Sequence, residues 1–316
     1  MSAPVNTGSI AKLLWPGLDK VFGLEYTDRP TEYTDLYDIK SSKKAYEEQQ
    51  SMMGLGLPQV KGEGNQIFFD SFEQAFTYRY TNVTYTLGFG ITKEAIEDAQ
   101  YDLTIVGQNE SRGLGRAMRL GREYIGANRF NLAFDTGAGS LYGDGYQMIG
   151  AAQPTKSGAT FANCPVNAAG TAIGVDLSEL ALEQACIDIA GFTDDRGNLV
   201  ALSGQSLHIP RQLEFEAARI LQSVLQSDST TNNLNALKSL SKFPKGVIIN
   251  HYFTDPDAFF IRTDIPTGTG LVWFDRVRTE FAMDNDFTTT NALYTARFRA
   301  SCGISDKRAC WGSQGA

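Results

Sequence analysis

The sequence has few of the residues and none of the spacings on which catalytic and metal sites are usually built. Its 316 residues include two histidines, His208 and His251, and neither lies in an HExxH or HxH pattern. Its glycines form neither GxGxxG after a strand nor GxxxxGK[ST], and Ser140 lacks a GxSxG context. A metal site that joins the histidines to Asp255 or Asp257 is the alternative. We predict no catalytic, cofactor-binding or metal-binding residues.

Cysteine is also scarce. The four cysteines are Cys164, Cys186, Cys302 and Cys310. Their spacing is too wide for CxxC metal pairs, and their number is too small for a disulfide scaffold. We expect free and mostly buried thiols. A small loop closed by Cys302 and Cys310, or a bridge between chains, is the alternative in an oxidising medium.

Long apolar runs are absent. No segment approaches the ~20 apolar residues of a transmembrane helix, and the N-terminus has neither a basic start nor a sustained apolar stretch. We expect a protein that stays in the cytosol where it is made. Its net charge of −8 argues against a free nucleic-acid-binding protein, but it allows one that encloses nucleic acid with little affinity. With 42% apolar residues, the chain is long enough for one large or two modest domains.

The longest proline-free helical pattern covers residues 92–134. Its apolar residues recur at three- and four-residue steps: Ile96, Ala99, Leu103, Val106, Ala117, Leu120, Tyr124 and Ala127. Glycines predict a kink near Gly113 and Gly115. The pattern indicates an amphipathic helix whose glycines allow close neighbours. Alternatively, its arginines (Arg112, Arg116 and Arg119) contact another subunit or nucleic acid.

Residues 1–47 have the character of an arm. A short apolar helix is expected to break at Pro16-Gly17, and a polar, tyrosine-rich stretch follows. Nothing local buries its large apolar side chains, which are Trp15, Leu18, Phe22, Tyr33 and Tyr37. The arm is therefore expected to lie across the body of its own subunit or across a neighbour.

Residues 54–90 predict an aromatic β-ribbon, with strands at 65–69, 76–81 and 83–89. A two-stranded ribbon alone is marginally stable in water, so we expect another chain to cover it.

The second half of the chain predicts an α/β unit over 175–260 and then a long hairpin. A helix is expected to begin at Asp176, with its inward side chains at Leu177, Leu180, Ala181, Ala185 and Ile189. It is followed by a turn at 193–198, a strand at 207–210, a helix at 211–226, a surface loop at 227–233 and a strand at 245–250. Strands at 271–283 and 292–300 form the hairpin. Its tip, 284–291, resembles part of a calcium loop but lacks the glycine and terminal glutamate of that pattern.

Four segments resemble a known family in their order and character. They are ITKEAIEDAQYD at 91–102, LHIPRQLEFEAARIL at 207–221, HYFTDPDAFFIRTD at 251–264, and the charged hairpin within 278–313. Together they resemble the major capsid proteins of tailed bacteriophages, which have the Hong Kong 97-like α+β fold. The resemblance implies an N-terminal arm (1–47), an extended loop (48–90), a peripheral domain with a spine helix (91–174 and 266–300) and an axial domain (175–265 and 301–316).

The resemblance implies a structural protein without enzymatic activity or cofactors. It would self-assemble into pentamers and hexamers of an icosahedral head in the host cytoplasm, and it would contact the enclosed double-stranded DNA weakly. The implied partners are further copies of the chain, a portal, a scaffolding protein and possibly a cement protein. Because no acidic helical extension precedes the arm, we expect the scaffolding protein to be a separate chain. An encapsulin-type compartment, a metal-dependent hydrolase at His208 and His251, and a non-viral fibre subunit are the alternatives.

Some members of this family join their subunits by a Lys–Asn isopeptide bond. Lys61, with Asn285 or Asn291, provides the candidates here. We do not expect the bond, because no catalytic acid can be assigned from the sequence.

Overall fold

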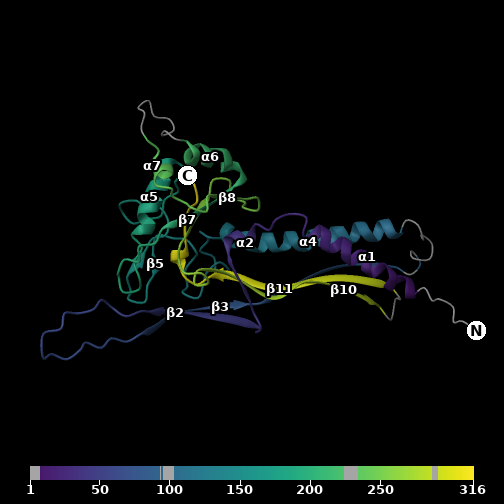
Figure 1. Cartoon of the computed structure of the whole chain (residues 1–316), viewed down its shortest axis with the longest axis horizontal. Coiled ribbons are helices and arrows are strands. Elements are labelled where there is room, and N and C mark those ends of the chain that lie inside the picture. The colour runs from purple at the N-terminus through teal and green to yellow at the C-terminus, as the bar shows by residue number, and fades with distance from the viewer. Residues whose placement is uncertain (1–7, 93, 95–102, 224–233, 287–290) are drawn as a thin grey trace, which may run out of the picture.

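The computed structural model describes residues 8–92, 94, 103–223, 234–286 and 291–316. The chain is elongated, with a long helix-and-sheet layer, an α/β unit above one end of it, and a thin ribbon that projects beyond that end (Figure 1). Residues 95–102, where the long helix was predicted to begin, lie outside the described residues. So do the predicted loop at 227–233 and the centre of the hairpin tip.

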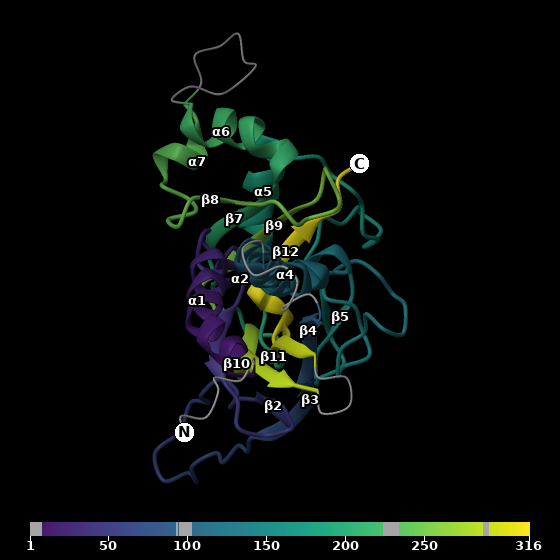
Figure 2. The ribbon, with the colours of Figure 1, turned by 90° about the vertical axis from the view of Figure 1, so that its right-hand side faces the viewer.

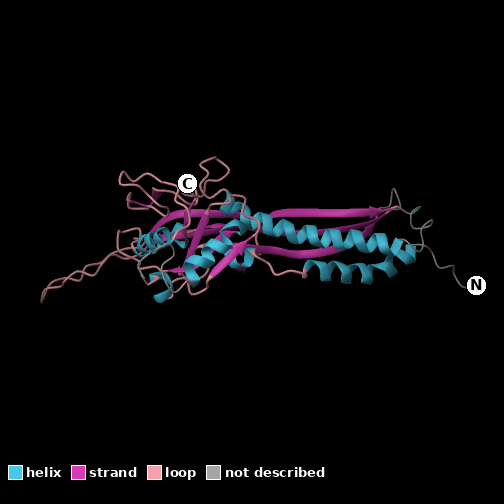
Figure 3. Cartoon of the chain, turned by 90° about the horizontal axis from the view of Figure 1, so that it is seen from above, coloured by secondary structure: helices cyan, strands magenta, loops and turns pink. Residues whose placement is uncertain are grey.

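One four-stranded sheet forms the long layer, in the order β1-β10-β11-β4. Its strands are β1 (Asp38–Ser41), β10 (Leu271–Asn285), β11 (Ala292–Ile304) and β4 (Val83–Ile91). The β10–β11 hairpin confirms the predicted pair of extended strands. Helix α4 (Leu103–Asn131) runs along this sheet, with α1 (Gly8–Tyr26) beside it (Figure 3).

The buried face of α4 differs from the predicted one. Leu114, Met118, Ala127 and Phe130 are buried, whereas Tyr124 is 57% exposed. The reason is that polar residues and glycines also occupy the buried face: Gly107, Ser111, Gly115, Arg119, Arg122, Glu123 and Gly126. All of these except Arg119 contact the arm. Hydrophobic periodicity alone therefore misplaces this face.

The glycines of α4 do not kink the helix, which is continuous through Gly113 and Gly115. A β-carbon on Gly115 would lie 2.9 Å from the backbone oxygen of Phe22 in α1. A β-carbon on Gly126 would lie 2.9 Å from Cβ of Tyr33. The kink prediction is wrong, and the prediction of glycines at close contacts is confirmed.

The arm lies on its own subunit. Helix α1 continues through Pro16 and Gly17, so the predicted break is wrong, and α2 (Tyr33–Leu36) follows it. Phe22 stacks on Phe281 with ring centroids 4.8 Å apart, and Tyr33 packs on Trp273 at 4.6 Å. Leu18 and Tyr37 are buried too, which contradicts the neighbour alternative for these side chains. The side chain of Trp15 lies outside the described residues.

The α/β unit contains a second four-stranded sheet, in the order β12-β9-β7-β8. Its strands are β12 (Cys310–Ser313), β9 (Phe259–Thr263), β7 (Gly204–Pro210) and β8 (Val247–Asn250). Between the parallel strands β7 and β8 lie the 3₁₀ turn η1 (Arg211–Leu213), α6 (Glu214–Gln222) and α7 (Ala236–Ser239). The unit has its own core, in which Leu182, Ile209, Phe259 and Trp311 are fully buried.

Helix α5 (Glu179–Ala190) covers this core but begins later than predicted. Ser178 is its N-cap, because the Ser178 side chain accepts a hydrogen bond from the amide of Ala181. Leu180 is 75% exposed and was wrongly predicted to face inward. The short strands β5 (Gln153–Pro154) and β6 (Thr160–Phe161) and the turn η2 (Lys307–Ala309) complete the described elements.

The ribbon consists of β2 (Tyr46–Met53) paired antiparallel with β3 (Glu73–Thr81). Tyr78 and Tyr80 of β3 are buried against Phe274 and Val272, and Asn82 then leads the chain into β4. Residues 54–72 contain no strand, so the strand predicted at 65–69 is wrong: these residues pair with no strand among the described residues. We call 54–72 the projecting segment.

Candidate assembly surfaces

The projecting segment carries seven exposed large apolar side chains. It extends away from the body in two perpendicular views (Figures 1 and 3). Phe68 is 59% exposed and Phe69 is 86% exposed. The other large apolar side chains exposed on this segment are Leu55, Leu57, Val60, Ile67 and Phe72. Soluble monomers rarely leave so much apolar surface together, so this segment marks an interaction site.

A second group of exposed apolar side chains lies on the helices of the α/β unit. Leu180 and Ile187 are exposed on α5, Phe215 on α6, and Leu240 just after α7. These helices gather at the end of the unit that faces away from the long sheet (Figure 2). This end therefore also presents apolar side chains that the described part of the chain leaves exposed.

The arginines of α4 divide into exposed and buried groups. Arg112 and Arg116 are exposed, whereas Arg119 and Arg122 are buried. Arg122 Nη2 lies 2.7 Å from Asp275 Oδ1 on β10, and Arg122 Nη1 donates a hydrogen bond to Tyr33 Oη at 2.9 Å. Of the three arginines proposed from the sequence for contacts beyond the subunit, only Arg112 and Arg116 are therefore placed to make them.

Glu123 links α4 to the arm. Its carboxylate accepts hydrogen bonds from the backbone amides of Glu32 at 3.1 Å and Tyr33 at 2.9 Å, where α2 begins. Burial raises the pKa of Glu123 to about 7, although these two hydrogen bonds oppose the shift. We therefore expect the attachment of the arm to depend on pH.

The two histidines occupy unlike environments. His208 is buried in β7, where its Nε2 lies 2.9 Å from Ser206 Oγ, and burial lowers its pKa to about 3. His251 is exposed after β8, and its Nδ1 lies 2.7 Å from Glu32 Oε1. Among the described residues, no three His, Cys, Asp or Glu side chains are grouped to hold a metal ion.

The other residues considered from the sequence are the four cysteines and Ser140. All four cysteines are free; Cys186 is half-buried and the other three are buried. Ser140 donates a hydrogen bond to Asp135 Oδ2 at 2.7 Å, within a loop.

The candidate cross-link residues lie far apart within one chain. Lys61 is in the projecting segment, whereas Asn285 and Asn291 flank the tip of the β10–β11 hairpin, at the opposite end of the molecule (Figure 1). A bond between these ends would have to join two copies.

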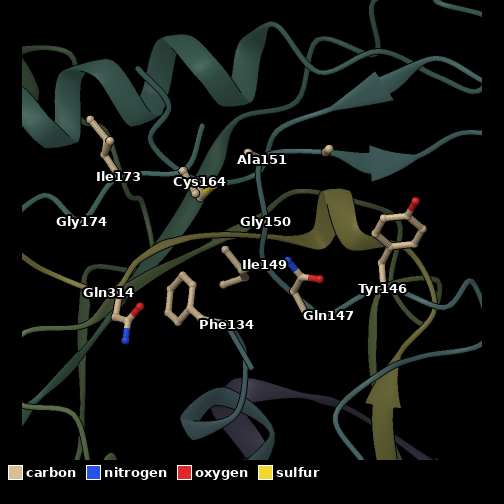
Figure 4. A pocket seen from close by; sticks show the side chains of 12 residues that line it. Phe134, Tyr146, Gln147, Ile149, Gly150, Ala151, Cys164, Ile173, Gly174 and Gln314 are labelled. Carbon is tan, nitrogen blue, oxygen red and sulfur yellow. The ribbon is translucent and has the colours of Figure 1, made fainter. Parts of the chain in front are cut away.

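The cavity in Figure 4 lies between the α/β unit and the end of α4. It has a volume of about 380 Å³ and is lined by Phe134, Ile149, Cys164 and Ile173, with the amides of Gln147 and Gln314 at its edge. Burial raises the pKa of Cys164 to about 11, so its thiol is protonated at neutral pH. The cavity thus holds neither a charged side chain nor a reactive thiolate. Its lining is typical of an imperfectly filled apolar junction.

No helix in the described part of the chain combines the length and apolar character that crossing a lipid bilayer requires.

The chain is similar to several solved structures of shell proteins. The chain is similar to a virus-like particle from Pyrococcus furiosus, with 10% identity and a TM-score of 0.55 over 94% of this chain and 98% of that one. It is also similar to the capsid of Cyanophage P-SCSP1u, with 11% identity and a TM-score of 0.53 over 91% and 89% of the two chains. The capsid of Myoviridae Phage XM1 matches at 12% identity and a TM-score of 0.51, over 90% and 92%. A search of curated proteins finds no match.

The long helix on a mixed sheet, the α/β unit and the projecting ribbon thus define a capsid-type subunit with the Hong Kong 97-like fold. The phage capsid protein family model matches residues 76–312, and the chain belongs to that family. The protein is a structural component of a phage capsid shell, as the sequence predicts. The compartment, hydrolase and fibre alternatives are not favoured.

Proposed function

We propose that this chain is the major head protein that builds pentamers and hexamers of an icosahedral head around double-stranded DNA. The observation that carries the proposal is the exposed apolar surface of the projecting segment, above all Phe68 and Phe69. A contact between this surface and a different surface of the next copy is heterologous, and such contacts close into rings when repeated. Burial of each aromatic side chain would contribute about 1.5–3 kcal/mol.

The proposed parts follow the two cores of the chain. Residues 1–47 act as the arm, 48–90 as the extended loop, 91–174 with 266–300 as the peripheral domain, and 175–265 with 301–316 as the axial domain. Separate buried clusters around Trp273 and around Trp311 support two cores, although Phe253, Phe260 and Ile304 of the proposed axial segments pack in the Trp273 cluster. The exposed helices α5 and α6 suit the axial unit for contacts around the capsomer centre.

We propose that the enclosed DNA is contacted weakly and without sequence preference. The net charge of −8 supports this, because an acidic wall attracts a polyanion little. Arg112 and Arg116 are the proposed intersubunit or DNA contacts from α4, since both are exposed. If Arg116→Glu leaves both assembly and DNA packaging unchanged, this role for Arg116 is wrong.

The remaining features of the proposal concern partners and location. Assembly takes place in the host cytoplasm, with a portal, a separate scaffolding protein and possibly a cement protein. The chain has no catalytic activity. Mass spectrometry of immature shells tests the separate scaffold, because shells that contain this chain alone would contradict it.

Electron microscopy of the purified protein at increasing concentration tests the main proposal. We expect closed shells or capsomers. The protein concentration needed to form them should fall as added salt screens the acidic charge of the subunits. A compact monomer that persists at high concentration would overturn the proposal, as would filaments.

A further inference from the structure

A single arginine from the α/β unit connects the two ends of the projecting segment. Arg196 Nε donates a hydrogen bond to the backbone oxygen of Gly54 at 2.6 Å, where the segment leaves β2. Arg196 Nη2 donates to the backbone oxygen of Ser71 at 3.1 Å, where the chain returns towards β3. Its Nη1 lies 3.0 Å from Asp70 Oδ2. The guanidinium therefore bridges the outgoing and returning parts of the segment.

Asp70 completes this bridge from the other side. Its Oδ2 accepts a hydrogen bond from the amide of Gly56 at 2.8 Å, and its Oδ1 accepts from the amide of Ser71 at 2.9 Å. A β-carbon on Gly56 would lie 3.2 Å from Asp70 Oδ2 and 3.4 Å from Arg196 Nη1, so glycine leaves room for both. We call these five residues, Gly54, Gly56, Asp70, Ser71 and Arg196, the clasp.

The clasp is attached to a hydrogen-bonded turn. Asp194 Oδ1 accepts hydrogen bonds from the amides of Arg196 and Asn198, each at 2.8 Å, and Gly197 has a φ of +88°. The next side chain in the turn, Asp195, accepts a hydrogen bond from Arg308 Nη2 at 2.8 Å. The turn is therefore joined to the body on one side and to the projecting segment on the other.

We propose that Arg196 is a positioning residue for assembly, which sets the direction in which the projecting segment leaves the subunit to meet a second copy. A planar guanidinium can bind a carboxylate and two backbone oxygens at fixed angles, which a single ammonium group cannot do. A segment held in its binding direction loses less conformational freedom on association. The inference rests on the proposed function.

Spin-label distances test the clasp directly. One label is placed on the projecting segment (Gln66→Cys) and the other on an exposed position of α4 (Asn128→Cys), in a background with Cys186→Ala. Labelled chain is diluted into excess unlabelled chain, so that only distances within one subunit are measured. Arg79→Ala is the matched control, because Arg79 lies on the same ribbon in an exposed pair with Glu48 at 4.0 Å.

We expect a narrow distance distribution for the parent protein and for Arg79→Ala, and a broad one for Arg196→Ala. Arg196→Ala should also need an about tenfold higher concentration to form shells, as expected for the loss of a charge-assisted bridge. Arg196→Lys should not restore either property. An unchanged distribution in Arg196→Ala, restoration by lysine, or a broad distribution with unaltered assembly would overturn the proposal.

The two proposals fail separately. If the parent protein never forms shells but Arg196→Ala still broadens the distance distribution, the proposed function is wrong. The clasp then still holds the projecting segment, without a role in assembly. An unchanged distribution in a chain that does form shells would remove the clasp alone.

Discussion

Replacing Phe68 and Phe69 with serine should weaken assembly without weakening the subunit. The two rings are 59% and 86% exposed, so they contribute little to the core of their own chain. Complete burial of one such ring contributes about 1.5–3 kcal/mol of free energy. If a neighbouring copy covers both rings, and the contribution is scaled by their exposed fractions, each contact gains about 2–4 kcal/mol. At ~1.4 kcal/mol per factor of ten, the concentration needed for assembly should rise about 30- to 1000-fold.

Light scattering and sedimentation across a concentration series measure this shift. Gln66→Ser is the matched control, because it changes an uncharged, exposed side chain on the same projecting segment and removes no apolar surface. The thermal unfolding midpoint of the unassembled subunit should be equal in all three proteins. An unshifted assembly concentration for the double variant would refute the idea that this segment drives association, and a lowered unfolding midpoint would show that the rings pack against their own chain.

Three further predictions concern the stability of the subunit, each read from urea unfolding of the unassembled chain. Gly115→Ala should destabilise it by about 1–3 kcal/mol, because the new methyl group would meet the backbone of α1, whereas Gly113→Ala, which faces open space, should stabilise it by up to about 1 kcal/mol. Asp275→Ala should cost about 3–5 kcal/mol, because it leaves the buried Arg122 guanidinium without its carboxylate. The pKa of Glu123 in the folded state is about 7, above its ordinary value of 4.5. Glu123 therefore contributes fully to the free energy of unfolding below pH 4.5, and this contribution is lost as the pH rises through 7. Glu123→Gln should flatten this part of the pH profile.

Each of these predictions has an outcome that contradicts it. Equal effects of alanine at Gly113 and Gly115 would mean that α1 does not approach α4 as closely as the structure places it. Asp284→Ala removes an exposed carboxylate from the same strand, so a loss as large as that of Asp275→Ala would show that burial is not the cause. A pH profile that Glu123→Gln leaves unchanged would exclude Glu123 as its source.

The sequence predicted best those elements whose signals are local. The β10–β11 hairpin follows from alternating residues, and the turn at 193–198 from the hydrogen bonds that Asp194 makes with its own backbone neighbours. In the α/β unit, the helices α5 and α6 and the strands β7 and β8 were predicted, although both helices begin later than expected. Helix α7 and the strands β9 and β12 were not predicted. The predicted elements depend on residues that are close together along the chain.

The errors concern contacts between distant segments. The buried face of α4 was misplaced because Arg122 and Glu123 are buried there, each with partners from the arm or from β10. Pro16 was predicted to end a helix, yet α1 continues past it and packs on α4. The clasp was missed because nothing in the sequence connects Arg196 to Asp70, 126 residues away.

The sequence by itself determined the presence of an arm, an aromatic ribbon, a long helix and an α/β unit, because these follow from composition and short-range periodicity. The class of the protein came from the resemblance of four segments to a known family. Only the tertiary structure decided which apolar side chains the subunit covers itself. It buries Phe22 and Tyr37 of the arm and leaves Phe68 and Phe69 exposed. The physical reason is that burial depends on which surfaces meet in space. Side chains of equal hydrophobicity therefore cannot be distinguished from the sequence alone as buried or exposed.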